Sequence, residues 1–363
     1  MHRPGPGDRS GDRTALNSEP VSTYERIAEL PLEVEGYDLE GFERPVSSAF
    51  VRRTTLVRLR GAGETGTGED VTYDGAEHER LQAAGPILPL AGSHTIDTFS
   101  RLLEGLRLPG GPYGRWAYEG AALDLALRQA RTSLERALDL EARPVRFVVS
   151  RRLGEPPSTA SLHRLLALVP GLRFKLDPTS SWDEPLVAEL AALGVVEAVD
   201  LKGMYRGTPV DQRPDAELYA LVARAFPDAW IEDPNLTDPA TAGALDAHRD
   251  RIAWDEPIHS VADIEALPSE PGAINVKPSR FGSLRALLET YAYCEQRVIS
   301  VYGGGQFELG KGRGQIQHLA SIFHPGAPND VAPGGFNLPE PPPGLPGSPL
   351  EPPAHVAGFG WDD

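Results

Sequence analysis

From about residue 145 onward, short apolar runs alternate with segments whose apolar residues recur at helical spacing. Residues 215–226 and 283–296 are two such helical segments. Strands and helices that alternate in this way form βα units, so the sequence predicts a parallel sheet covered by helices. Seven apolar runs are typical of buried strands, and they lie near Val148, Asp177, Lys202, Asp233, Asp255, Lys277 and Tyr302.

The number of strands favours a closed barrel over an open, doubly wound sheet. No glycine-rich turn of the dinucleotide-binding kind follows the first strand, so we expect an α/β barrel at residues 113–332. Before it, residues 26–43 and 54–63 are typical of strands, and residues 95–108 are typical of a helix. This pattern predicts a small α+β domain at residues 23–112.

The two ends of the chain lack the patterns of a folded core. Residues 1–22 are rich in Pro, Gly, Ser and Arg and have no apolar stretch of a secretory signal, which predicts a disordered leader. Residues 333–363 are too rich in Pro for a helix or a central strand, so we expect them to run over the surface and return to the first domain. The run HVAGFGW at residues 355–361 is expected to add a final strand.

Charge and cysteine content exclude several classes of partner. A formal net charge of −17 would repel a nucleic-acid backbone and an anionic membrane surface, so neither is an expected partner. No apolar run approaches the ~20 residues that a membrane-spanning helix needs. Cys294 is the single cysteine, which excludes an intramolecular disulfide and favours the reducing cytoplasm.

Lysine is rare in this chain, and each lysine is therefore a candidate for chemistry. Only four of the 35 basic residues are Lys, at positions 175, 202, 277 and 311. Arg replaces Lys wherever a solvated positive charge is enough, but Arg does not readily lose its proton. A lysine that is kept in such a chain indicates a position where an amine is needed.

Three acidic residues stand at the ends of consecutive predicted strands. Asp200, Glu232 and Asp255 close the third, fourth and fifth strands. In a barrel the carboxyl ends of the strands converge on one face, where ligands bind. Three carboxylates gathered there repel one another unless a cation neutralises them, and their hard oxygens suit Mg²⁺ or Mn²⁺.

These residues, in this order, resemble the enolase superfamily, in particular its muconate-lactonizing and o-succinylbenzoate synthase branch. The resemblance implies a modified (β/α)₇β barrel of the TIM type with an α+β N-terminal capping domain. It also implies that the three acids bind Mg²⁺ and that Lys277 acts in acid-base chemistry. The residues that carry it are Lys175, Asp200, Glu232 in WIEDP, Asp255 in WDEP, Lys277 in INVKPSRFGS, and the run GGGQFELGKGRGQIQHLASIF at residues 303–323.

The implied reaction is removal of the proton α to a carboxylate, which gives a metal-stabilised enolate. A divalent cation stabilises the charge that develops, and an amine held in a confined site next to a cation is free to accept the proton. Pairing of a Lys or His base with Mg²⁺ is a known feature of this superfamily. We therefore expect a metal-dependent lyase, of the o-succinylbenzoate synthase type, or a cycloisomerase. Its partner would be a small carboxylate, and since relatives commonly assemble, a homo-oligomer is also expected.

Two positions depart from the pattern of the superfamily. The second strand normally ends in Lys-x-Lys, but here it reads Lys175-Leu176-Asp177, so the base on the opposite face of the substrate is missing. The third strand normally carries Asp-x-Asn, but here it reads Asp200-Leu201-Lys202. By the two-residue period of a strand, Asp177 and Lys202 both face the barrel interior. We expect Lys202 either to pair with Asp177 or to replace the lost base.

Further polar residues are expected to face the substrate, and other functions stay open. Glu256 follows Asp255, while Glu308 and Lys311 follow the seventh strand, where the ligand-binding loops of a barrel lie. Racemisation of an N-acylamino acid or epimerisation of a dipeptide normally needs a base on each face, so it requires Lys202 or Asp177 as the second base. A diverged binding protein that keeps the fold without catalysis is the remaining alternative.

Overall fold

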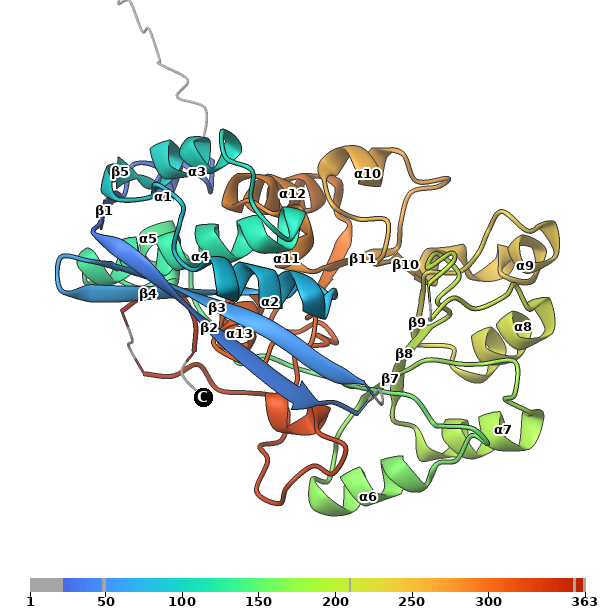
Figure 1. Cartoon of the computed structure of the whole chain (residues 1–363). Helices are drawn as coiled ribbons and strands as arrows, with labels where there is room; N and C mark the ends of the chain where they lie inside the picture. The colour runs from blue at the N-terminus through green and yellow to red at the C-terminus, as the bar shows by residue number, and fades with distance from the viewer. Residues whose placement is uncertain (1–21, 48–49, 209, 355–356, 362–363) are drawn as a thin grey trace, which may run out of the picture.

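The computed structural model describes residues 22–47, 50–208, 210–354 and 357–361. They form a cap with an antiparallel sheet and a modified (β/α)₇β barrel with a parallel sheet, as the sequence predicts (Figure 1). The predicted leader lies outside the described residues, apart from its last residue. None of the helices in the described ranges is long and apolar enough to cross a membrane.

The cap contains four helices and five strands. In chain order they are α1 (Glu25–Ala28), β1 (Pro31–Val34), β2 (Gly36–Pro45), β3 (Val51–Gly61), β4 (Glu64–Asp70), α2 (Gly75–Ala84), β5 (Gly92–Thr95), α3 (Ile96–Glu104) and α4 (Gly111–Gln129). Strands β2, β3 and β4 form one antiparallel sheet in that order, and β1 pairs with β5. The strand predicted at residues 26–43 thus begins with a short helix, and the predicted helix at 95–108 is α3.

Helix α4 lies against β4, and two glycines of the strand allow the close approach (Figure 1). A Cβ atom built on Gly68 would lie 2.0 Å from the carbonyl oxygen of Ala117, and one on Gly66 would lie 2.2 Å from the backbone nitrogen of Leu125. Both contacts are far inside van der Waals distance and involve backbone atoms that cannot rotate away. Only glycine fits at these positions without a shift of the helix.

Gly68→Ala is therefore expected to lower the free energy of unfolding by about 1–3 kcal/mol, because the helix must move away from the sheet. Gly36→Ala, in the neighbouring strand β2, is the matched control, since nothing lies within 4 Å of a Cβ atom built there. Urea unfolding followed by circular dichroism measures both changes. Equal stability of the two variants would contradict this packing.

The barrel sheet contains seven parallel strands that follow one another in chain order. They are β6 (Val149–Arg151), β7 (Phe174–Leu176), β8 (Val196–Asp200), β9 (Trp230–Glu232), β10 (Ile252–Trp254), β11 (Ala273–Val276) and β12 (Ser300–Gly303). Every residue of β7, β10 and β11 is buried, as expected for strands covered on both faces. The seven apolar runs identified in the sequence correspond to these strands.

The two edges of this sheet are joined by a very short eighth segment. Asn329 forms a parallel bridge with Phe147, next to β6, and Asp330 forms one with Gly304, next to β12. The final strand expected from HVAGFGW is not found in the described part of that run, where Gly358 makes a single bridge with Ser133. Asn329 and Asp330, which precede HVAGFGW in the chain, therefore close the barrel.

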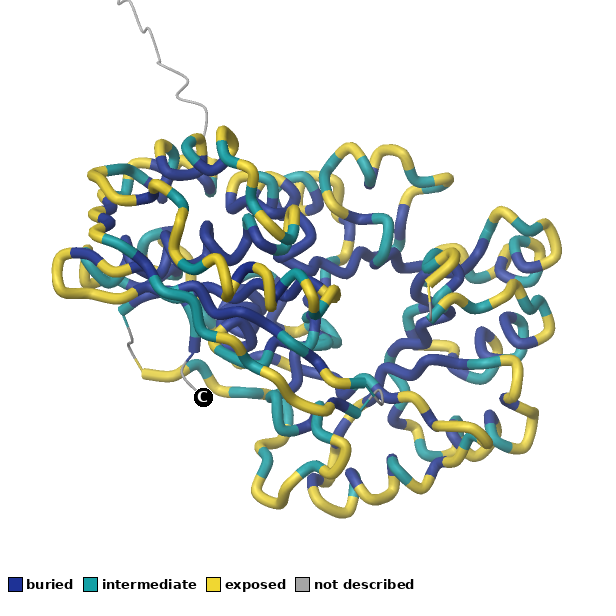
Figure 2. The backbone as a smooth tube through the Cα atoms, viewed as in Figure 1, coloured by how far each residue is buried: buried dark blue, intermediate teal, exposed yellow. Residues whose placement is uncertain are grey.

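Helices surround the barrel strands on the outside. They are α5 (Leu134–Leu138), α6 (Ala160–Leu168), α7 (Glu184–Leu193), α8 (Ala216–Ala225), α9 (Pro239–Ala244), η1 (Asp246–Arg251), α10 (Val261–Glu265), α11 (Pro278–Phe281), α12 (Leu284–Arg297), α13 (Gly312–Phe323) and η2 (Gly334–Asn337). Figure 2 shows buried strands inside and exposed turns of α6 to α9 outside. The predicted helices at 215–226 and 283–296 are α8 and α12. After η2, the described residues form neither helix nor strand, as expected for the Pro-rich segment.

Candidate active site

Three acidic residues meet at the carboxyl ends of neighbouring barrel strands. Asp200 is the last residue of β8, Glu232 is the last residue of β9 and pairs with it in register, and Asp255 directly follows β10. All three are fully buried. One carboxylate oxygen from each lies within 4.8 Å of the others, and we call this group the acidic triad. The sequence correctly predicted that these three residues gather on one face.

Lys175 from the middle of β7 binds two members of the triad. Its ammonium donates to Glu232 and lies 3.3 Å from Oδ2 of Asp200, with Asp330 at 3.7 Å. Burial opposes the charged form, but the neighbouring carboxylates outweigh it and hold the pKa of Lys175 well above its usual value. The neighbouring acids therefore favour the charged form of Lys175.

Asp255 is held by two cations. Nζ of Lys277, the residue after β11, lies 2.7 Å from Oδ2, and Nη1 of Arg280 lies 2.9 Å from Oδ1. The hydroxyl of Tyr205 also donates to Oδ2, at 2.8 Å. The positive charges of Arg280 and Lys277 overcome the effect of burial and lower the pKa of Asp255. The charged form of this carboxylate, which a cation ligand needs, is therefore favoured.

The pKa of Lys277 is shifted in the opposite direction from the pKa values of Lys175 and Lys202. Burial lowers its pKa, and the nearby positive charge of Arg280 acts in the same direction, while Asp255 opposes them. A lowered pKa makes it easier for the ammonium to give up its proton, which a lysine must do before it acts as a general base. The amine lies beside the triad, at the position that the sequence predicted.

Lys202 does not make the expected contact with Asp177. Its ammonium binds Oδ2 of Asp200, two residues earlier, and not Asp177, whose Oδ2 accepts from Nε of Arg152 at 3.0 Å. Strand β8 ends at Asp200 and Lys202 has a φ of 53°, so the two-residue alternation of the strand no longer sets its direction. Although burial opposes it, the charges of Asp177 and Asp200 raise the pKa of Lys202.

Several residues that shape the site were not identified in the sequence. Asp233 accepts the backbone N–H groups of Asp255 and Glu256, at 2.8 and 2.9 Å, and fixes the chain after β10. The hydroxyl of Tyr302 on β12 donates to Glu232. With Arg280 and Tyr205 these residues complete the surroundings of the triad. Arg280 lies three residues after Lys277 in INVKPSRFGS, and this spacing is the feature of the sequence that could have identified it.

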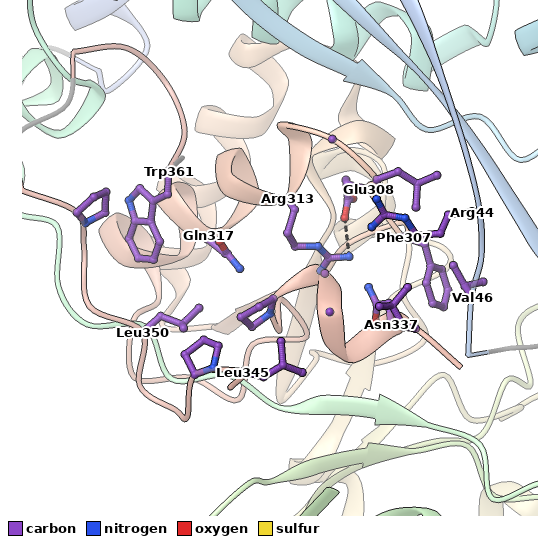
Figure 3. Close-up of a pocket in the computed structure, with 18 of the residues that line it drawn as sticks. Arg44, Val46, Phe307, Glu308, Arg313, Gln317, Asn337, Leu345, Leu350 and Trp361 are labelled. Carbon is purple, nitrogen blue, oxygen red and sulfur yellow. Dashed lines mark ion pairs between the residues drawn. The ribbon is translucent and has the colours of Figure 1, made fainter. Parts of the chain in front are cut away.

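The predicted substrate-facing residues lie in different places. Glu256 follows the triad residue Asp255, whereas Glu308 pairs with Arg313 at 2.8 Å and accepts from the backbone of Gln306. Glu308 and Arg313 border a cavity of about 470 Å³, together with Arg44 of β2 and residues of the C-terminal segment (Figure 3). Lys311 is exposed and directly precedes α13. None of the triad residues lines this cavity, and of the predicted substrate-facing residues Glu308 does.

The geometry of the triad fits a divalent cation. Three carboxylate oxygens from three strands converge, and hard oxygen donors of this kind are the ligands of Mg²⁺ and Mn²⁺. Burial and the charges of Asp200 and Asp255 raise the pKa of Glu232, while Lys175 opposes them, so repulsion within the triad is not fully relieved. Residues Asp200, Glu232 and Asp255 could therefore hold such an ion.

Known proteins with a similar sequence or structure include several enzymes. The chain is 28% identical over 335 residues to an N-succinylamino acid racemase from Amycolatopsis sp, covering 84% of this chain and 86% of that protein. A dipeptide epimerase from Enterococcus faecalis V583 superposes with a TM-score of 0.68 at 16% identity, covering 91% of this chain and 99% of that one. A muconate lactonizing enzyme from Pseudomonas putida gives 0.64 at 21% identity, covering 85% and 90%.

A further structural relative and two family matches give the fold and the family of the protein. An unknown member of the enolase superfamily from Enterococcus faecalis V583 superposes with a TM-score of 0.66 at 22% identity, covering 85% of this chain and 89% of that one. Residues 25–137 match the N-terminal domain of DUF8230, a domain of unknown function, and residues 141–338 match its C-terminal domain. The chain therefore belongs to the DUF8230 family and has the barrel-and-cap fold of the enolase superfamily.

Proposed function

We propose that this protein is a metal-dependent enzyme in which Lys277 removes the proton α to the carboxylate of a small substrate. The contact between Lys277 and Asp255 carries this proposal, because it places an amine with a lowered pKa beside a group that suits a cation. Asp200, Glu232 and Asp255 would hold Mg²⁺, with Mn²⁺ as a substitute. When bound, the cation supplies positive charge to the substrate carboxylate as the proton leaves.

The charge states of the lysines favour a reaction with one base. Lys175 and Lys202 are both paired with acids of the site, and both have raised pKa values, so neither offers a free amine. Lys277 is left as the amine base. A single base suits syn elimination of water, as in dehydration of the o-succinylbenzoate synthase type, or cycloisomerisation. A lyase or cycloisomerase is thus the reaction class that we favour.

Racemisation or epimerisation is the second candidate. The relative from Amycolatopsis is an N-succinylamino acid racemase and the neighbour from Enterococcus is a dipeptide epimerase. Such reactions need a proton donor on the face opposite Lys277. Asp177 and Lys202 are the residues of this chain that would have to supply it. Their departure from the usual pattern also motivates the third candidate, a binding protein without catalysis.

Deuterium exchange distinguishes the three candidates. The protein is incubated in D₂O with Mg²⁺ and a panel of N-acylamino acids, dipeptides and cyclohexadienyl carboxylates, and ¹H NMR follows the α position. We expect loss of the α proton signal for at least one class of substrate, prevented by EDTA, with elimination or ring formation and no inversion. Inversion of a chiral substrate would replace the one-base reaction with racemisation. No exchange across the panel would favour the binding protein.

A further inference from the structure

The oxygens of the acidic triad already have hydrogen-bond partners within the protein. Oδ2 of Asp200 accepts from Lys202, Oε1 of Glu232 accepts from Lys175, and Oδ2 of Asp255 accepts from Lys277. The remaining three oxygens accept from the backbone of Lys202, from Tyr302 and from Arg280. Cationic side chains thus hold the carboxylates together, so a divalent cation must compete with at least one of them.

Lys202 is the cation best placed to leave. Its side chain is 12% exposed, compared with 2% for Lys175, 8% for Lys277 and 5% for Arg280. Lys175 also lies within a strand and binds two members of the triad, whereas Lys202 follows the end of β8 and binds only Asp200 within the triad. Its long, flexible side chain can change partner without a movement of the sheet.

An alternative partner for this ammonium lies on the neighbouring strand. Asp177 directly follows β7, and its carboxyl group is largely buried. Oδ2 is bound by Arg152, but Oδ1 is buried and has no hydrogen-bond partner among the described residues. A buried acceptor without a partner is unusual and unfavourable. The charge of Asp177 already acts on the ammonium of Lys202.

We propose, building on the metal-binding role proposed above for the triad, that Lys202 is an internal counter-ion that the divalent cation displaces. In the metal-free protein it neutralises Asp200. When a divalent cation binds, repulsion between like charges moves the ammonium to the unpartnered oxygen of Asp177. The protein therefore keeps its site assembled without metal, and metal affinity is set by the exchange of Lys202 between two carboxylates.

Binding of Mn²⁺, followed by electron paramagnetic resonance without substrate, tests this proposal. Lys202→Met removes the competing charge and is expected to lower the Kd for Mn²⁺ by at least about tenfold, which corresponds to ~1.4 kcal/mol. Arg249→Met is the matched control, because it removes one positive charge from η1, at the entry to β10 and away from the triad. Its Kd is expected to equal that of the wild type.

Asp177→Asn tests the second position of the ammonium. Without the negative charge at Asp177, the displaced Lys202 loses its alternative partner, so the Kd for Mn²⁺ is expected to rise about tenfold. In the Lys202→Met background the same substitution is expected to have a much smaller effect, since there is no ammonium to move and only the loss of one nearby negative charge remains. A merely structural role of Asp177 would give equal effects in both backgrounds, and that result would overturn the proposed exchange.

The outcomes separate this proposal from the proposed function. Equal Kd values for the wild type and Lys202→Met would overturn the counter-ion role alone and leave the triad as a metal site. Absence of Mn²⁺ binding in both proteins would overturn the counter-ion role together with metal dependence. A third outcome is tight Mn²⁺ binding by Lys202→Met that Glu232→Gln abolishes, with no deuterium exchange on any substrate. That result would support the counter-ion role of Lys202 and remove only the catalytic proposal.

Discussion

Lys277→Ala is expected to reduce α-proton exchange by about 10³-fold, the scale of a lost general base. The amine is buried, lies 2.7 Å from Asp255 and has a lowered pKa, and no other amine of the site is both near the triad and free of a raised pKa. The measurement is the initial rate of deuterium incorporation with the best substrate of the panel, at saturating Mg²⁺.

Two controls separate loss of the base from loss of the site. Mn²⁺ is expected to bind Lys277→Ala at least as tightly as the wild type, because the variant loses a positive charge near the ion. Lys277→Arg keeps that charge but not a titratable amine, so its exchange rate is expected to fall as far as that of the Ala variant. Exchange in Lys277→Ala within about threefold of the wild type would rule out this residue as the base.

Asp255→Asn is expected to lower the free energy of unfolding by about 3–5 kcal/mol, since it leaves two buried cations without their counter-charge. Lys277 and Arg280 both bind this carboxylate, and both are largely buried. Arg280 also donates to the backbone carbonyl of Asp255, and the substitution keeps this contact, but a neutral amide side chain cannot replace the lost negative charge. Urea unfolding in the absence of metal gives the value directly.

The matched control is Asp246→Asn, which breaks an ion pair of the surface. Asp246 binds Arg249 at 2.9 Å, but both side chains are well exposed. An exposed pair contributes ~0–1 kcal/mol, so this variant should unfold at nearly the wild-type urea concentration. Similar destabilisation by the two substitutions would show that the charges around Asp255 do not hold the site together.

The barrel and the triad could be predicted because they depend on local patterns. Apolar runs of strand length, each ending in a polar residue, identify the strands that carry Asp200, Glu232 and Asp255. The parallel arrangement then requires their carboxyl ends to meet at one face. The scarcity of Lys likewise singled out Lys175 and Lys277, both of which contact the triad.

The partners within the site could not be predicted, because they depend on where each strand ends. Lys202 binds Asp200 since it lies beyond β8 in a left-handed conformation, whereas the prediction continued the strand through it. The closing segment at Asn329 and Asp330 makes single bridges, too short for a periodic pattern to reveal. Arg280 reaches Asp255 from α11 and Tyr205 reaches it from the segment after β8, and contacts of that kind arise only from the tertiary fold.

The most direct test of whether the acidic triad is a metal site beside an amine base is a crystal structure of the protein grown with Mn²⁺. Anomalous scattering from the ion would give its position. We expect one anomalous peak between the carboxylates of Asp200, Glu232 and Asp255, with Nζ of Lys277 close by. Density for Lys202 in the same crystals should lie at Asp177 and not at Asp200. An anomalous peak only at another place in the protein, or no peak at saturating Mn²⁺, would contradict the metal-dependent chemistry proposed for this protein.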